Sequence, residues 1–403
     1  MRSTTRMITA AAGLAAVVAA PVGASADVQI GFLGGFTGPI ESLTPPIFEA
    51  AQLAATHVNE QGGLLDGEQI EMPSADTGCV DSTMAVNGAD RLINSDDVVA
   101  IVGALCSGAT IAAANNVAVP AGVVMISPAS TSPALTELDD NDLVFRTPPS
   151  DAYQGVVLAR ILRDEGVDSI AVTYVNNDYG KGLADAVEAA FEDAGGTVAV
   201  NEAHEDGKAD YRPEIGSMAA SGAETLVVLA YVDGSGQTII RQAVEGGDFQ
   251  SFAGGDGMVG DALIEAAGPG NLDGMILTRP GSPENPGSET YAQLATDAGL
   301  DPNATFGAQG YDAGFLLALA IEQAGSADSE GLSAALREVA NEPGEVILPG
   351  EWEKAKQLIA DGQDVNYEGA TGTLEFDEHG DVPGVIEQLV IEGESINTVG
   401  LMQ

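Results

Sequence analysis

Apolar and polar positions follow a repeating order along this chain. Continuous apolar runs, which are typical of strands buried on both faces, lie at 28–36, 70–75, 98–105, 123–127, 169–175, 197–200 and 225–232. Segments with apolar residues at helical spacing lie between these runs, at 46–59, 81–94, 108–117, 151–165, 180–194, 215–221 and 236–245. Strands that alternate with helices form parallel sheets covered by helices on both faces, so we predict an α/β fold.

The same order restarts after Pro148-Pro149, which indicates more than one domain. A chain of 403 residues is too long for one ordinary core, and its 45% hydrophobic and 19% charged residues are typical of a folded globular protein. We therefore predict two consecutive doubly wound domains. The Pro- and Gly-rich segments 280–290 and 341–351 are interpreted as surface loops or crossings between the domains.

The first 26 residues carry the pattern of a secretory signal peptide. Arg2 and Arg6 precede an apolar run at 10–20, and Ala24-Ser25-Ala26 supplies small residues for cleavage. The run is shorter than the roughly 20 apolar residues that span a membrane. We expect cleavage after Ala26 and an exported, soluble mature chain that is not inserted in a membrane.

The chain is strongly acidic, with 61 Asp and Glu against 14 Lys and Arg and a formal net charge of −47. Such a charge argues against nucleic acid and anionic membranes as partners. It names no ligand, and we interpret it as a solvated acidic surface suited to a saline exterior.

Cys79 and Cys106 are the two cysteines of the chain, and in an exported protein two cysteines most often form a disulfide. Together with His57, His204 and His379 they show no metal-ligand spacing. We therefore expect no metal ion and no cofactor.

The motifs of common enzymes are absent around the candidate nucleophiles. A nucleophile elbow needs glycine two residues before and after the serine, whereas Ser107 is flanked at those places by Leu105 and Ala109. The sequence has neither a G-x-G-x-x-G fingerprint after its first strand nor a phosphate-binding loop. An enzyme that uses Ser107 or Cys106 as its nucleophile stays an alternative, but we predict that the chain is not an enzyme.

Polar residues gather where predicted strands end, which favours a binding site, because ligands of parallel sheets sit at the carboxyl ends of the strands. The residues concerned are Ser107, the segment 127–132, the segment 177–180, Tyr231 and Asp256. Each also has a structural interpretation: Ser107 as a helix cap, Tyr231 as core and Asp256 as a turn residue. The site is favoured because the positions recur at strand ends in both halves of the chain.

Several motifs, in this order, resemble the leucine/isoleucine/valine-binding protein family, the type I periplasmic receptors of ABC transporters. The segments are IGFLGGFTGPI, VGALCSGAT, VVMISPASTSPAL, NNDYGKGL, GGDGMVGDALIEAAG, YDAGFLLALAI and YEGATGTLEFDEHGD. The resemblance implies two Rossmann-like lobes joined by three crossings, with a disulfide in lobe 1. Lobe 1 would comprise 27–147 plus 280–383, and lobe 2 would comprise 148–279 plus 384–403.

The resemblance also implies roles for individual residues. Ser107 and Thr131 would hold the ligand α-carboxylate through their hydroxyls, and Ala129 and Ser130 would present backbone groups to the same end. Asp256 would pair with the α-ammonium. The residues implied to close over the ligand from lobe 2 are Tyr179 and Tyr231.

Two positions depart from the leucine-type pattern: Asp256 replaces Glu, and Leu43 replaces an aromatic residue. We predict a periplasmic receptor that captures a small, branched-chain amino acid (Leu, Ile or Val) and delivers it to the permease of an ABC transporter. The alternatives are a receptor for an amide, urea or aromatic acid, and a sensor ectodomain of the same fold.

Overall fold

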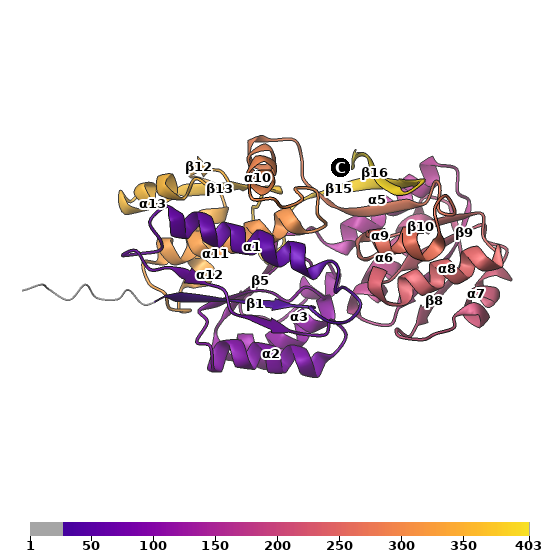
Figure 1. Cartoon of the computed structure of the whole chain (residues 1–403), viewed down its shortest axis with the longest axis horizontal. Coiled ribbons are helices and arrows are strands. Elements are labelled where there is room, and N and C mark those ends of the chain that lie inside the picture. The colour runs from indigo at the N-terminus through magenta and orange to yellow at the C-terminus, as the bar shows by residue number, and fades with distance from the viewer. Residues whose placement is uncertain (1–26, 403) are drawn as a thin grey trace, which may run out of the picture.

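The structure is a computed structural model that describes residues 27–402, so the predicted signal peptide lies outside the described residues. Two sheets with their helices stand side by side along the long axis (Figure 1). We call the first sheet and the helices packed on it lobe 1, and the second sheet and its helices lobe 2. The residue limits predicted for the lobes stay a prediction.

Lobe 1 is built on a parallel sheet of six strands, in the order β2-β1-β4-β5-β6 with β3 also paired to β1. Its strands are β1 (Val28–Gly34), β2 (Ile70–Glu71), β3 (Ser74–Asp76), β4 (Ala100–Gly103), β5 (Val124–Ser127) and β6 (Val144–Arg146). The early helical segments are α1 (Thr44–Glu60), α2 (Ser82–Asn94), α3 (Ser107–Ala113), η1 (Ala114–Ala118), α4 (Val119–Ala121) and η2 (Pro133–Leu135).

Later parts of the chain return to lobe 1, where α11 packs along α1 (Figure 1). The returning helices are α10 (Pro286–Asp297), α11 (Gly307–Ala324), α12 (Leu332–Ala340) and α13 (Trp352–Ala360). A small third sheet accompanies them, with β12 (Glu345–Ile347), β13 (Val365–Gly369) and β14 (Gly372–Thr373). Helix α11 is buried over most of its length because its apolar residues face both α1 and α12.

Lobe 2 is built on a sheet of seven strands, in the order β16-β15-β11-β10-β9-β7-β8. Its strands are β7 (Ser169–Val175), β8 (Thr197–His204), β9 (Thr225–Leu229), β10 (Ser251–Gly254), β11 (Ile276–Gly281), β15 (Val385–Glu392) and β16 (Ser395–Met402). Its helical segments are α5 (Asp151–Asp164), α6 (Asp178–Asp193), α7 (Arg212–Ala219), η3 (Val232–Gly236), α8 (Gln237–Gly246), η4 (Asp256–Met258) and α9 (Asp261–Ala267).

The chain passes between the two sheets three times: between β6 and α5, after β11, and before β15. The last passage brings β15 and β16 to lobe 2, where they pair antiparallel. The prediction of purely parallel sheets is therefore wrong at this edge. The C-terminal strands form a hairpin, which needs no crossover helix.

Predicted and observed elements differ mainly where glycine or proline interrupts a run. The run at 98–105 ends as a strand at Gly103, whose φ of +128° leaves the extended region. An added Cβ there would meet the Leu33 carbonyl oxygen at 2.3 Å, so only glycine fits. The run at 70–75 is split into β2 and β3 around Pro73.

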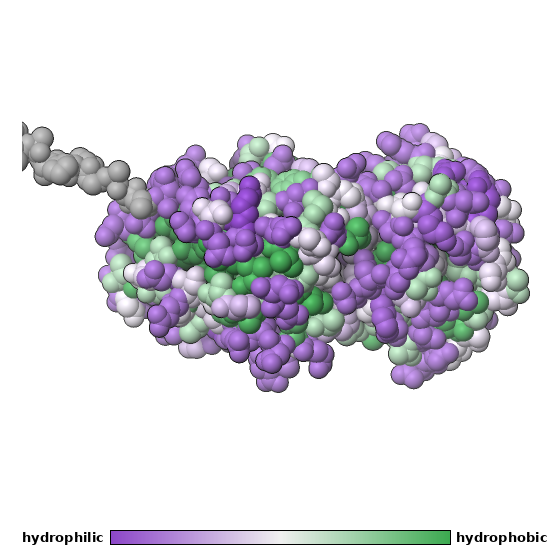
Figure 2. All heavy atoms as spheres, turned by 90° about the horizontal axis from the view of Figure 1, so that it is seen from below, coloured by the Kyte–Doolittle hydropathy of each residue, from purple (hydrophilic) through white to green (hydrophobic). Residues whose placement is uncertain are grey.

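In the face shown by Figure 2 hydrophilic residues cover most of the area, apolar residues gather over the middle of lobe 1, and a waist separates the two lobes. None of the helices between residues 27 and 402 combines the length and the apolar character needed to cross a membrane.

Candidate ligand-binding site

A cavity lies between the two lobes, at the carboxyl ends of their strands. Lobe 1 contributes an apolar wall, made by Ile40, Leu43, Ile47, Leu105, Cys106, Ala129 and Phe306, together with Ser107. Lobe 2 contributes Tyr179, Tyr231, Asp256 and Gly257. The two lobes meet beside this cavity, where Ser132 Oγ of lobe 1 donates a hydrogen bond to the Asp178 carbonyl of lobe 2 at 2.9 Å. The structure therefore shows the lobes closed on each other.

Ser107 reaches the cavity because β4 ends at Gly103 and α3 begins at Ser107 itself. Its side chain is 1% exposed, and its Oγ accepts a hydrogen bond from the Ser132 backbone N–H at 3.2 Å. Ser107 is the first residue of α3 and does not cap it, because the N-cap position is Cys106. Its hydroxyl proton is therefore available to an acceptor in the cavity.

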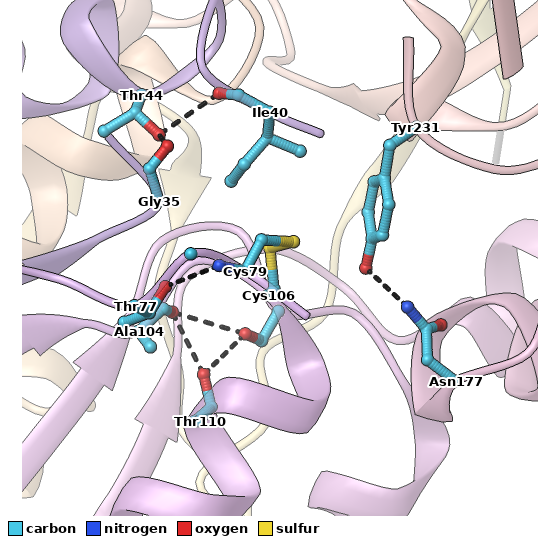
Figure 3. The surroundings of a disulfide bond; sticks show 12 residues. Gly35, Ile40, Thr44, Thr77, Cys79, Ala104, Cys106, Thr110, Asn177 and Tyr231 are labelled. Atoms are coloured by element: carbon cyan, nitrogen blue, oxygen red, sulfur yellow. Dashed lines mark hydrogen bonds between the residues drawn. A yellow bond between two sulfur atoms is a disulfide. The ribbon is translucent and has the colours of Figure 1, made fainter. Parts of the chain in front are cut away.

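Cys79 and Cys106 form a disulfide, as predicted from the export of the chain. The bridge joins the turn after β3 to the residue before α3, so it fixes the position from which Ser107 enters the cavity. Figure 3 shows the disulfide and Ile40, both from lobe 1, facing the ring of Tyr231 from lobe 2. Cys106 holds no free thiol, which removes it as a nucleophile.

The segment after β5 folds back on lobe 1 through its hydroxyls. Ser127 Oγ donates to the Ala104 carbonyl at 2.5 Å and accepts from the Ser130 backbone N–H at 2.9 Å. Ser130 Oγ lies 2.7 Å from Thr110 Oγ1. These bonds use the hydroxyl and the N–H of Ser130 inside the lobe and leave Ala129 as the residue of this segment that lines the cavity.

Two aromatic residues of lobe 2 close the other side. Tyr179 lies in the first turn of α6, and its ring stacks on Tyr231 with centroids 5.1 Å apart and planes 21° apart. The Tyr179 hydroxyl donates to Asp256 Oδ1 at 3.2 Å and accepts from the Gly257 N–H at 3.1 Å. Burial raises the pKa of both tyrosines, so both are neutral donors at pH 7.

Asp256 follows β10 and begins the short helix η4. Its side chain is 3% exposed, and Oδ1 accepts hydrogen bonds from Gln154 Nε2 at 2.9 Å and from Tyr179. Burial raises the pKa of Asp256 to about 6, while the Gln154 hydrogen bond opposes this rise. The carboxylate is therefore an anionic acceptor at neutral pH that two neutral donors hold in a nearly dry place.

Of the seven predicted ligand-binding residues, the structure brings five to the cavity: Ser107, Ala129, Tyr179, Tyr231 and Asp256. Ser130 and Thr131 are fully buried and do not line it. Two residues of the site were not predicted from the sequence: Phe306, which precedes α11 and lines the cavity, and Gln154 on α5, which donates to Asp256. The one available signal for Gln154 was its position shortly after the first crossing.

Among the described residues, no group of three or more His, Cys, Asp or Glu side chains could hold a metal ion. The site instead offers a hydroxyl donor and an apolar wall on lobe 1, and a carboxylate on lobe 2.

Comparisons with known proteins agree with this architecture. A profile of the family described as periplasmic binding protein matches residues 27–363. The leucine-, isoleucine-, valine-, threonine- and alanine-binding protein of Pseudomonas aeruginosa is 31% identical over 361 residues, which cover 89% of this chain and 88% of that protein. A chemotactic signal transduction system substrate-binding protein of Halobacterium salinarum is 29% identical over 361 residues, or 88% of this chain and 84% of that protein.

Solved structures also resemble this chain. A leucine-binding protein of Thermotoga maritima superposes with a TM-score of 0.79 at 26% identity, over 93% of this chain and 99% of that one. The predicted fold, with two doubly wound Rossmann-like lobes, is thereby confirmed. The family match covers most of the chain, and its relatives are binding proteins and not enzymes. The chain therefore belongs to the periplasmic binding protein family.

Proposed function

We propose that this protein is an exported receptor that binds a small, branched-chain amino acid in the cavity between its lobes. The observation that carries the proposal is the buried carboxyl of Asp256, held by Gln154 and Tyr179 across the cavity from the hydroxyl of Ser107. A zwitterion needs an anionic acceptor at one end and donors at the other, because an unmatched charge in a dry site is costly.

The wall between these polar ends favours an aliphatic side chain. Ile40, Ile47 and Leu105 are buried and line the cavity, and Leu43 and Phe306 complete the wall. Burial of an aliphatic side chain of valine or leucine size contributes about 1.5–3 kcal/mol. The names of relatives support this ligand class, since the Pseudomonas aeruginosa protein is named for leucine, isoleucine, valine, threonine and alanine.

We further propose that the lobes, with the limits 27–147 plus 280–383 and 148–279 plus 384–403, close by bending at the three crossings. After cleavage at Ala26 the receptor would work in the periplasm and deliver its ligand to the permease of an ABC transporter. Closure removes water from the site and so strengthens the charged contacts with the ligand.

A thermal-shift series with leucine, isoleucine, valine, an amide, urea and benzoate tests the ligand class. A ligand at 100 times its Kd stabilises the folded protein by about 2.7 kcal/mol, so the branched-chain amino acids should raise Tm clearly. A rise with the amide, urea or benzoate alone would contradict the proposal in favour of the corresponding receptor.

The variant Asp256→Asn keeps the shape of the site and removes the negative charge. We expect Kd for leucine to rise by about 10- to 100-fold, because a hydrogen bond to a charged group contributes about 1.5–3 kcal/mol. Unchanged leucine affinity, measured by calorimetry, would show that Asp256 does not hold the ammonium.

A sensor function is the second candidate, because the Halobacterium salinarum relative carries chemotactic signal transduction in its name. Deletion of the gene separates the two functions: a transport receptor is needed for uptake of labelled leucine, whereas a sensor is needed only for movement toward it. The enzyme alternative would require labelling of Ser107 by a serine-directed activity probe, and we expect none.

A further inference from the structure

A second cavity lies beside the crossing that follows β11, and the function described above does not use it. Lobe 2 contributes Arg279 of β11 and Glu387 of β15 to its lining, and the crossing contributes Ser282. The loop 302–306 and the first turn of α11, which belong to lobe 1, also line it. The cavity offers ≈ 110 Å³ to the centres of water-sized molecules. One water needs about 10–15 Å³ on this measure, so a molecule of a few heavy atoms has room.

Helix α11 begins at this cavity with unpaired backbone donors. Its N-cap residue is Phe306, and no side chain caps the helix. The N–H groups of Ala308 and Gln309 donate to no backbone or side-chain acceptor between residues 27 and 402, whereas the Gly310 N–H donates to the Phe306 carbonyl. Free N–H groups at the start of an 18-residue helix carry partial positive charge and favour an anion.

The side chain of Gln309 gives independent evidence for a ligand. Gln309 is 3% exposed and lines the cavity. Its backbone carbonyl accepts from Thr147 Oγ1 at 3.0 Å, but its side-chain amide forms no hydrogen bond with any described residue. Buried polar groups are nearly always hydrogen-bonded, so this amide indicates a partner that enters the cavity.

Arg279 adds a positive group with unused donors. Its side chain is 14% exposed, and its Nε donates to Glu387 Oε2 at 2.7 Å. Its Nη1 donates to the Asn303 carbonyl at 3.0 Å and to Thr305 Oγ1 at 2.9 Å. Its Nη2 forms no hydrogen bond within residues 27–402. Since Thr305 Oγ1 accepts from Arg279, its own proton is free for another acceptor.

The neighbouring carboxylate of Glu387 is already matched. Its Oε2 accepts from Arg279, and its Oε1 accepts from Thr398 Oγ1 at 2.7 Å. The Arg279–Glu387 pair is therefore neutral as a whole, and the start of α11 leaves the cavity with partial positive charge. The unused groups around the cavity are mostly donors.

We propose that this cavity binds a small carboxylate. The carboxylate oxygens would accept from the start of α11, the Gln309 amide and Arg279. A carboxylate offers about four acceptor positions in one plane and suits the fork of a guanidinium. A doubly charged anion such as sulfate fits less well, because it adds a second negative charge beside Glu387. Phe306 lines both this cavity and the proposed amino-acid site, so the new site is adjacent to that site and separate from it.

The test follows Tm while sodium acetate replaces sodium chloride, from about 0.1 to 100 mM. The ionic strength stays at about 0.5 M, which screens the acidic surface equally in every sample. We expect Tm to rise by about 2–5 °C and to be half-complete at about 1–10 mM, because so small a ligand binds weakly. General salt effects would instead grow in proportion to concentration without saturating.

Gln309→Leu removes the amide and keeps a side chain of similar size, so it should abolish the saturable rise. Without acetate this variant should melt at the same temperature as the wild type or higher, because it loses an unmatched buried amide. Gln309→Glu keeps the shape, puts a negative charge in the cavity and should abolish the rise as well.

Gln242→Leu is the matched control, because Gln242 is 2% exposed but accepts from the Tyr211 N–H and donates to the Ala209 carbonyl. This variant should lower Tm and keep the full acetate effect. A flat or unsaturable response of the wild type, or a response of both Gln309 variants equal to that of the wild type, would overturn the proposal. Leucine takes no part in this experiment, so its result is independent of the function proposed above.

Discussion

Asp233→Ala removes a contact that holds the two lobes together away from the ligand. Asp233 lies in η3 of lobe 2, and its Oδ2 accepts from the backbone N–H of Ser42 at 2.8 Å and from Ser42 Oγ at 2.6 Å. Ser42 belongs to the turn between β1 and α1 in lobe 1. Both hydrogen bonds therefore exist only when the lobes are closed, and their loss should shift the protein toward its open form.

The size of the shift follows from the position of the contact. A buried hydrogen bond to a charged group contributes about 1.5–3 kcal/mol, but Ser42 is exposed and Asp233 is half-buried, so water competes for both. We take about 1–2 kcal/mol for the two bonds together, which lowers the closed-to-open ratio by about 5- to 30-fold. Kd should rise by the same factor where the ligand-free protein is mainly open, because binding then has to form both bonds.

Titration calorimetry with leucine measures Kd, and small-angle scattering of the ligand-free protein measures the open fraction. The loss of affinity should be the same for leucine, isoleucine and valine, because closure is common to all of them. Asp168→Ala is the control: it breaks an exposed ion pair with Arg163 in the same lobe and should leave Kd unchanged. A loss confined to one ligand, or unchanged affinity, would refute the reasoning.

Three other predictions concern the closed site. Leucine affinity should fall as the pH is lowered through about 6, because burial raises the pKa of Asp256 to about 6 and the protonated acid cannot pair with an ammonium; a flat calorimetric profile from pH 7.5 to 4.5 would contradict this. Replacing Cys79 and Cys106 by serine opens a loop of 27 residues and should lower the free energy of unfolding in urea by about 3–4 kcal/mol, and an unchanged midpoint would show that the bridge adds no stability. Tyr231→Phe loses only the weak hydrogen bond from Asn177 at 3.4 Å and keeps the ring stack, so Kd should change less than about three-fold, whereas a ten-fold loss would assign the hydroxyl a direct role.

The strand and helix order could be predicted because each element depends on its own residues. Strand β7 occupies its predicted range, and α5 and α6 each begin and end within two residues of their own predicted limits. The C-terminal hairpin could not be placed in the same way. β15 and β16 join lobe 2 through pairing with β11, more than a hundred residues earlier in the chain.

The candidate site also contains residues that the local sequence reveals and residues that only the folded structure reveals. Ser107, Tyr231 and Asp256 could be found because polar residues at the ends of apolar runs stand out in the sequence. Gln154 could not, since a glutamine within a helix carries no local signal and becomes notable only when the fold brings it to Asp256. The Ser42–Asp233 contact depends on how the two lobes meet, and no local pattern encodes that.

Arg146 has a consequence for how this receptor could be used. Its guanidinium holds the carbonyls of Thr131 and Ser132, and it pairs with Asp381 shortly before the chain returns to β15. The binding segment and the lobe 1 ends of two crossings are thus tied to one side chain. A fluorescent reporter attached to lobe 2 would therefore register the bending of the crossings. Residues of the apolar wall could be exchanged to change which ligand binds, and the reporter would still follow the same bending.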